Sequence, residues 1–207
     1  MTDPSYADKA AFFDSQARAE WADQGYGVLE HPKLIRLLEL LDPAPGNALL
    51  EPGCGTGRLT RILGQAVGPE GQVTAMDISE RMVEIARERC DGLPQVAVVL
   101  ADMESFPLPP ARFHAVACHQ VFPHFNDRAR ALARLAECLR PSGRLVVSHF
   151  IGRRKVNDVH SQAGTAVERD LLPDADEMRA LLQAAGFRID LLDDADEHYF
   201  LAARKEA

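Results

Sequence analysis

The sequence predicts an α/β fold: a doubly wound, mostly parallel sheet of seven strands with an antiparallel last strand and helices on both faces. Three observations predict it. Short apolar runs alternate with segments of helical periodicity along the 207 residues. A glycine-rich loop joins the first run to a helix. The last two runs, 187–192 and 198–203, are separated only by a turn, which makes them antiparallel neighbours.

The elements follow in order. Residues 4–22 and 32–41 show helical spacing, and prolines and a glycine end the second segment. Five further strands are expected at 48–50, 72–76, 96–100, 113–118 and 144–148. The run 96–100 is apolar throughout, which predicts a strand covered on both faces. Helices are expected after the glycine loop, after the N-cap Ser79 and around Leu132–Leu139. Asp174 and Glu177 form a capping-box pattern for a last helix that ends at Gly186.

Composition narrows the class of protein. The net charge is −8 and the pI about 5.4, so an acidic surface would repel a phosphate backbone and we expect no nucleic-acid partner. The four cysteines form no CxxC pair, which argues against a disulfide framework or a zinc knuckle. Residues 1–14 do not have the pattern of a signal peptide, and no apolar stretch is long enough to span a membrane. We therefore expect one cytoplasmic domain over residues 1–207.

The glycine loop follows the first core strand. Its three glycines, Gly53, Gly55 and Gly57, let the backbone turn and approach a ligand closely. A nicotinamide dinucleotide site also has such a loop and an acid about twenty residues later, a place that Asp77 fills. The dinucleotide pattern, however, requires a third glycine where this chain has Arg58.

Two acidic residues favour a different ligand. Glu51 ends the strand before the loop, where a carboxylate suits a ligand with an ammonium and a sulfonium group better than a pyrophosphate. Asp102 ends the third core strand, from which a side chain can reach an adenine edge.

From about residue 47 to residue 204, the chain resembles the class I S-adenosylmethionine (SAM)-dependent methyltransferases, in the small-molecule (type 11-like) branch. The matching segments are Leu50-Glu51-Pro52-Gly53-Cys54-Gly55-Thr56-Gly57, Ala75-Met76-Asp77-Ile78-Ser79, Ala101-Asp102-Met103-Glu104, Phe113-His114-Ala115-Val116 and Leu139-Arg140-Pro141-Ser142-Gly143-Arg144-Leu145. The resemblance implies a Rossmann-like core over residues 46–207 that binds SAM and releases S-adenosyl-L-homocysteine.

The resemblance also implies roles for individual residues. Glu51 and the loop (Gly53, Cys54, Gly55, Gly57) hold the methionine end of SAM, and Asp77 accepts hydrogen bonds from both ribose hydroxyls. Ile78 packs on the adenine, Asp102 and the Met103 backbone read the adenine edge, and His119 lies near the methionine. Residues 1–45 resemble the helical lid of small-molecule methyltransferases, in which Phe12, Phe13, Trp21 and Tyr26 would close over the acceptor and exclude water.

Histidines mark the acceptor side. His124 follows the fourth core strand and His149 ends the fifth, so both should face the crevice at the carboxyl ends of the strands. The insertion 151–173 lies above that crevice, and helical spacing puts Arg153, Asn157 and His160 on one face. We predict His124, His149 and His160 as catalytic candidates, with Tyr26, Arg153 and Asn157 contacting the substrate. The spacing of these histidines does not fix an acidic residue beside them as a further metal ligand, so we predict no metal site.

The predicted function is transfer of a methyl group to a small-molecule acceptor, preferably an aromatic or quinone-like compound or a thiol. The sequence leaves open whether an oxygen, nitrogen, sulfur or carbon atom is methylated. Two alternatives remain: a catalytically silent SAM-binding sensor or partner subunit, and, less favoured, an NAD(P)-dependent oxidoreductase. The sequence does not indicate the oligomeric state.

Overall fold

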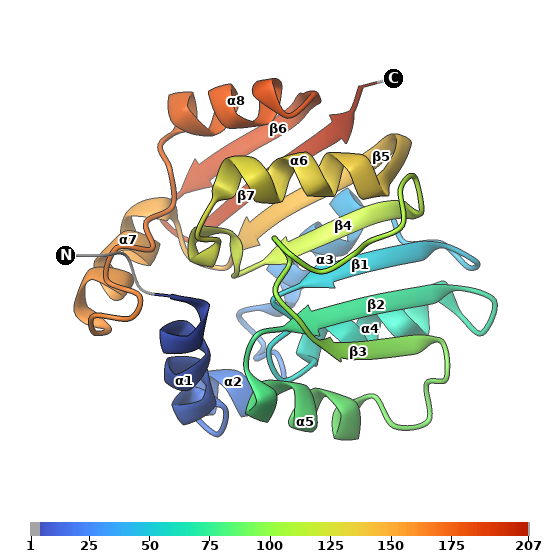
Figure 1. Cartoon of the computed structure of the whole chain (residues 1–207), viewed down its shortest axis with the longest axis horizontal. Helices are drawn as coiled ribbons and strands as arrows, with labels where there is room; N and C mark the ends of the chain where they lie inside the picture. The colour runs from blue at the N-terminus through green and yellow to red at the C-terminus, as the bar shows by residue number, and fades with distance from the viewer. Residues whose placement is uncertain (1–4, 207) are drawn as a thin grey trace.

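The computed structural model describes residues 5–206 and contains one seven-stranded sheet in the order β3-β2-β1-β4-β5-β7-β6 (Figure 1). The strands are β1 (Ala48–Pro52), β2 (Gln72–Asp77), β3 (Val96–Leu100), β4 (Phe113–His119), β5 (Leu139–His149), β6 (Phe187–Ala195) and β7 (His198–Lys205). The pairs among β1 to β5 are parallel, whereas β7 lies antiparallel to both β5 and β6. The predicted sheet with its reversed last strand is therefore confirmed.

Helices cover both faces of the sheet. They are α3 (His31–Leu41), α4 (Arg58–Val67), α5 (Glu80–Arg89), α6 (Arg128–Cys138), α7 (Arg153–Gln162) and α8 (Ala175–Ala184). Leucines of α3 and α4 pack in one buried cluster on the sheet, and the apolar sides of α6 and α8 pack in a second cluster on the other face. Figure 1 shows α6 and α8 in front of the sheet and α3 and α4 behind it.

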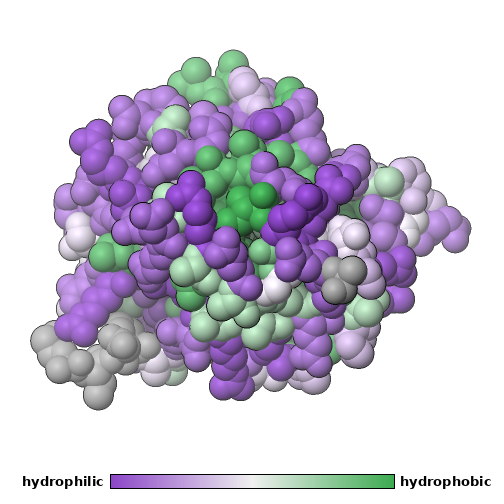
Figure 2. All heavy atoms as spheres, turned by 90° about the horizontal axis from the view of Figure 1, so that it is seen from above, coloured by the Kyte–Doolittle hydropathy of each residue, from purple (hydrophilic) through white to green (hydrophobic). Residues whose placement is uncertain are grey.

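The second cluster reaches the surface near α8 and β6. Leu181 of α8 and Ile189 of β6 pack against it while staying only partly buried. The face viewed from above is otherwise largely hydrophilic, with hydrophobic side chains gathered in its middle (Figure 2).

Two sequence expectations about strands need correction. The run 96–100 does form β3, but β3 pairs only with β2 at the edge of the sheet, and Leu100 is 48% exposed. An apolar run thus marked a strand without fixing its place in the sheet. Strand β5 begins earlier than predicted, at Leu139, because the Pro141–Gly143 segment is an irregularity within the strand, with a register shift and Ser142 at φ 61°.

The predicted helix 4–22 is broken in the structure. It divides into α1 (Tyr6–Gln16) and the short α2 (Glu20–Asp23), because Ala19 is extended at ψ 150°. The break lets Ala17 and Ala22 join one buried cluster with Met82 of α5. It also leaves the Ala22 carbonyl to accept a hydrogen bond from the Thr56 hydroxyl of the glycine loop.

Capping confirms the other helix starts. The Ser79 hydroxyl accepts from the Met82 amide at the start of α5, and the Asp174 carboxylate accepts from the Asp176 and Glu177 amides at the start of α8. The insertion 151–173, predicted as irregular with a helical start, contains α7 followed by a coil. Within residues 5–206, no helix is both long and apolar enough to cross a membrane.

Candidate functional site

One large pocket opens at the carboxyl ends of the first four strands, beneath α1 and α2. The space between its walls, including the part that is open to solvent, is about 920 Å³. Its walls come from the β1–α4 loop, the ends of β2, β3 and β4, and the N-terminal segment. The lining residues are Tyr6, Phe13, Trp21, Ala22, Tyr26, Glu51, Gly53, Cys54, Gly55, Thr56, Arg58, Leu59, Met76, Asp77, Ile78, Met82, Ala101, Met103, His119, Gln120, Val121, His124 and Phe125.

The glycine loop is shaped by close contacts at two of its glycines. A Cβ atom on Gly53 would lie 2.1 Å from Cγ2 of Val121, and Gly53 has φ +67°. A Cβ on Gly57 would lie 3.0 Å from the Cα of Ala86 in α5. Gly53 therefore permits the approach of the loop to the segment after β4, whereas Gly57 serves helix packing and is not part of the pocket lining.

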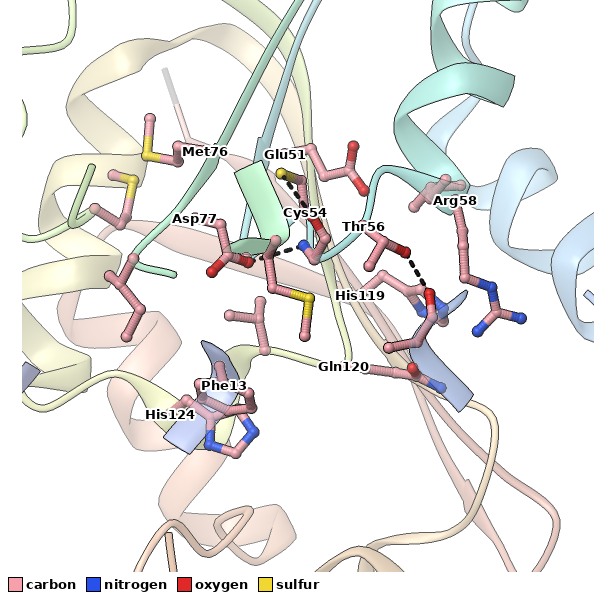
Figure 3. A pocket seen from close by; sticks show the side chains of 18 of the residues that line it. Phe13, Glu51, Cys54, Thr56, Arg58, Met76, Asp77, His119, Gln120 and His124 are labelled. Atoms are coloured by element: carbon pink, nitrogen blue, oxygen red, sulfur yellow. Dashed lines mark hydrogen bonds between the residues drawn. The ribbon is translucent and has the colours of Figure 1, made fainter. Parts of the chain in front are cut away.

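Asp77 ties the loop to β2. Its Oδ2 accepts from the Gly55 amide at 2.8 Å (Figure 3), and its Oδ1 accepts from the Ser79 amide at 2.9 Å. Burial raises the pKa of Asp77, while these backbone hydrogen bonds act in the opposite direction. The carboxylate is therefore held rigidly at the rim of the loop, in the place predicted for contact with a ribose.

Glu51 is a buried carboxyl group that faces the pocket. It accepts a hydrogen bond from the Thr60 hydroxyl at 2.7 Å. Burial, with a smaller contribution from the charge of Asp77, raises the pKa of Glu51 to about 8 against the lowering effect of Thr60. A carboxyl group in this environment gains most from a ligand cation, because a cation would favour its charged form.

The adenine-side predictions divide into two groups. Ile78 and Met103 line the pocket, but the side chain of Asp102 does not. Its carboxylate instead accepts from the Glu104 amide at 2.7 Å, so it holds the loop after β3.

Cys54 of the glycine loop lines the pocket, and burial raises the pKa of its thiol well above the usual value.

His119 extends from the end of β4 into the pocket. Its Nδ1 lies 2.9 Å from the Ser148 hydroxyl, and its ring centroid lies 4.5 Å from the ring centroid of Phe150. Its buried Nε2 has no hydrogen-bond partner among the residues that the structure describes. Burial, followed by the positive charge of Arg58, lowers the pKa of His119 to about 3. The imidazole is therefore neutral, and its unpartnered Nε2 belongs to a residue that lines the pocket.

Arg58 and Thr56 are pocket residues to which the sequence interpretation gave no site role. The Arg58 guanidinium lies 4.1 Å above the ring of Tyr26 and donates to the Trp21 carbonyl at 2.8 Å. Thr56 reaches the Ala22 carbonyl. Arg58 had served only as an argument against a dinucleotide, yet together with Thr56 it fastens the segment 21–26 over the pocket. The position of Arg58 directly after the third glycine of the loop is the sequence feature that could have indicated this role.

The acceptor-side candidates do not converge as predicted. His124 lines the pocket, on the side opposite Glu51 (Figure 3). His149 is buried beside Tyr199 of β7 and does not line the pocket. His160 lies beside His124, with ring centroids 4.7 Å apart and the ring planes tilted by 43°. Its Nδ1 contacts the Asp170 carbonyl, and His160 does not line the pocket.

The two remaining α7 candidates are engaged elsewhere. Asn157 exchanges two hydrogen bonds with the backbone of Leu172. Arg153 pairs with Asp194 at 3.4 Å, away from the main pocket. These two α7 side chains are therefore held by the chain itself, because the coil after α7 and the end of β6 supply their partners. Among residues 5–206, no three His, Cys, Asp or Glu side chains are arranged to hold a metal ion.

The N-terminal aromatics form the roof of the pocket. Phe13, Trp21 and Tyr26 line it, and Phe12, which contacts Phe13, does not. Phe13 meets the His124 ring edge-to-face, with centroids 5.0 Å apart. Trp21 remains 53% exposed at the mouth.

Known proteins are similar to this chain in sequence. Residues 50–147 match the family model described as "Methyltransferase domain". The chain is 30% identical to the ubiquinone/menaquinone biosynthesis C-methyltransferase UbiE of Ectopseudomonas mendocina (72% of this chain, 68% of that protein). It is 34% identical to the O-methyltransferase cnsE of Penicillium expansum (72% of this chain, 55% of that protein).

The fold itself recurs in solved structures. The N-methyltransferase NodS of Bradyrhizobium japonicum, solved in complex with S-adenosyl-l-homocysteine, superposes with a TM-score of 0.73 at 15% identity, over 97% of this chain and 100% of that one. Three of the curated relatives are considerably longer: the chain spans 32%, 55% and 59% of their lengths.

Proposed function

The chain belongs to the class I SAM-dependent methyltransferases, and we propose that it methylates a hydroxyl group on an apolar, aromatic small molecule. One observation carries the proposal of a hydroxyl acceptor. His124, held through Nδ1 by the Asp170 carboxylate at 2.7 Å, faces a pocket whose roof is aromatic. A hydroxyl acceptor needs a group to receive its proton, and an apolar ring needs a wall of this kind.

The residues present fit SAM. Buried Glu51, with its pKa raised to about 8, favours a cationic group, Asp77 offers a rigid carboxylate, and His119 Nε2 is a buried nitrogen for which the described chain provides no partner. Glu51, Asp77 and the loop at Gly53 and Gly55 would hold the cofactor, between Ile78 and Met103. When bound, SAM supplies a methyl group on an already activated sulfonium.

The protein then has to align the acceptor and keep the site dry. Phe13, Tyr26 and Phe125 would pack on an aromatic acceptor, and α1 with α2 would cover it. His124 offers Nε2 to the pocket because Nδ1 is occupied by Asp170. Burial lowers the pKa of His124, so the ring is neutral near pH 7 and free to accept a proton.

In the balanced reaction, the acceptor hydroxyl and SAM would give a methyl ether, S-adenosylhomocysteine and one proton. His124 Nε2 receives that proton from the hydroxyl. The acceptor proposed here narrows the wider sequence prediction, which also admitted quinone-like carbon centres and thiols. The relatives themselves act on different atoms, since their names give a C-methyltransferase and O-methyltransferases.

The test is a labelled-methyl screen of a library that contains phenols, quinones, thiols and amines. Wild-type protein should release S-adenosylhomocysteine and label a phenolic or related hydroxyl, identified by the mass and acid stability of the methyl product. H124N should lose turnover near pH 7 while binding S-adenosylhomocysteine as the wild type does. Labelling confined to thiols or carbon centres would contradict the hydroxyl proposal. Tight SAM binding with no acceptor in any class would instead favour the silent SAM-binding module.

A further inference from the structure

A buried lysine joins the roof of the pocket to the proposed base. Within α1, whose residues are all described, Lys9 is the one buried side chain, at 2% exposure. Its Nζ donates to Asp170 Oδ1 at 2.8 Å and to the His124 carbonyl at 2.9 Å. Asp170 uses its other oxygen, Oδ2, for His124 Nδ1. One ammonium thus holds both the carboxylate that orients His124 and the backbone of His124 itself.

A fully buried lysine is uncommon in proteins. Burying a lysine ammonium is costly unless it is paired and hydrogen-bonded, and here both conditions are met. Other attachments of α1 are also polar: the Tyr6 hydroxyl contacts Glu104, and the Ser79 hydroxyl donates to Asp14. Phe13 adds a partly buried apolar contact. Lys9 is the buried side chain of α1 and Phe13 is its side chain in an apolar cluster, so displacement of α1 would expose little apolar core.

The charge state of His124 depends on everything packed around it. Asp170, from the coil after α7, favours the protonated ring; Lys9 from α1 and His160 from α7 disfavour it, as does burial. His149 of β5 lies close enough to interact with the same cluster. If Lys9 were removed, Asp170 would remain buried with His124 as its one cationic partner among these groups. The ring would then hold a proton more tightly.

We propose that Lys9 is a positioning residue that keeps His124 neutral and correctly turned only while α1 covers the pocket. With α1 in place, Lys9 neutralises Asp170, and Asp170 fixes the ring with Nε2 toward the pocket. With α1 displaced, Lys9 leaves, His124 becomes the counter-ion of Asp170, and Nε2 carries a proton. Closing of the roof and assembly of the base are therefore one event. This inference rests on the proposed role of His124.

The test measures His124 directly by NMR titration of ring ¹⁵N-labelled histidines in the full chain, assigned with H124N. In wild type the neutral ring should carry its proton on Nδ1. K9Q keeps a hydrogen-bond donor but removes the charge, so the titration midpoint of His124 should move upward. K9R keeps the charge and should stay near the wild-type midpoint. K9M removes both the charge and the hydrogen-bond donor, and the titration midpoint of His124 should again move upward.

Lys33 supplies a matched control, because its ammonium also donates to a backbone carbonyl, that of Phe150, at 2.7 Å. K33Q should leave the His124 midpoint unchanged. Hydrogen exchange in α1 should become several-fold faster in K9Q and not in K33Q. An unmoved His124 midpoint in K9Q, a proton on Nε2 in wild type, or unchanged exchange of α1 would overturn the inference.

These outcomes are separable from the proposed function. If H124N retains full turnover, the base role fails even though the Lys9-dependent midpoint is measured. If H124N is inactive while the K9Q midpoint does not move, the base role stands and the coupling fails. Once an acceptor has been identified, the acid limb of the pH profile of kcat should move to higher pH in K9Q, with little change in KM.

Discussion

The two halves of the pocket are built in different ways. The half proposed to hold the methyl donor, the donor half, comes from residues at the ends of β1 and β2, and Asp77 accepts there from the backbone amides of Ser79 and Gly55, 2 and 22 positions away. The acceptor half joins distant parts of the chain: Lys9 meets Asp170 across 161 positions and His124 meets Asp170 across 46. Contacts with the backbone make the donor half rigid. Long-range polar contacts make the acceptor half conditional on the placement of α1.

The comparison predicts that substitutions in the donor half reduce cofactor affinity with no dependence on the roof. The largest effect is expected for D77A, which removes the carboxylate predicted to accept hydrogen bonds from both ribose hydroxyls. Hydrogen bonds to a charged group contribute about 1.5–3 kcal/mol each, so the dissociation constant for SAM should rise roughly 100-fold by calorimetry. D176A, which breaks an exposed ion pair on α8, is the control. An unchanged constant in D77A would remove Asp77 from the site.

G53A should come next. The added Cβ would meet Val121 Cγ2 at 2.1 Å at a position with φ +67°, and the left-handed conformation costs an alanine about 1–2 kcal/mol. SAM affinity should fall by about tenfold or more. The double variant G53A/V121A should recover part of the lost SAM affinity, because it removes the clash with the Val121 side chain but leaves the cost of the left-handed backbone at position 53. No recovery in the double variant would mean that backbone strain alone explains the loss.

Glu51 should make ligand binding depend on pH. Its pKa of about 8 in the free protein lies above the ordinary value, so the carboxyl is mostly protonated at pH 7. A cationic ligand requires the carboxylate, so binding at pH 7 should release close to one proton, and affinity should rise as pH approaches 8. Calorimetry of S-adenosylhomocysteine in two buffers of different ionisation enthalpy measures this. E51Q should abolish the release. Equal heats in both buffers for wild type would show that Glu51 is already ionised.

The same carboxyl sets a stability trend. Because its folded-state pKa is raised, Glu51 contributes stability that is complete below about pH 4.5 and is lost as pH rises through about 8. The melting temperature of the free protein should therefore fall across that window more steeply than that of E51Q.

The smallest effect is expected in the roof at Arg58. Its stacking on Tyr26 is worth about 0.5–1 kcal/mol at a partly exposed site. R58K keeps the charge and loses the planar stack, so fluorescence of Trp21, the single tryptophan, should report a more solvent-exposed mouth. SAM affinity should fall only a few-fold. A loss as large as that of D77A would mean that the two halves are not separable.

Prediction from sequence succeeded where a signal is local. Ser79 and Asp174 each accept hydrogen bonds from amides within three positions, so their capping roles could be inferred from spacing. Prediction went wrong where the partner is remote. His149 ends β5 as expected, yet it packs beside Tyr199 of β7, and Arg153 turns to Asp194 of β6. Nothing near either residue in the sequence indicates those partners.

The sequence by itself determined the order of the strands and the place of the glycine loop, because apolar periodicity and glycine conformation act within short segments, and its combined motifs indicated the family. Only the tertiary structure decided which histidine faces the pocket and what holds it there. Lys9 resembles any other lysine of an N-terminal helix until folding buries it between Asp170 and the His124 carbonyl. The energy of a buried charge depends on partners that only the folded chain brings together.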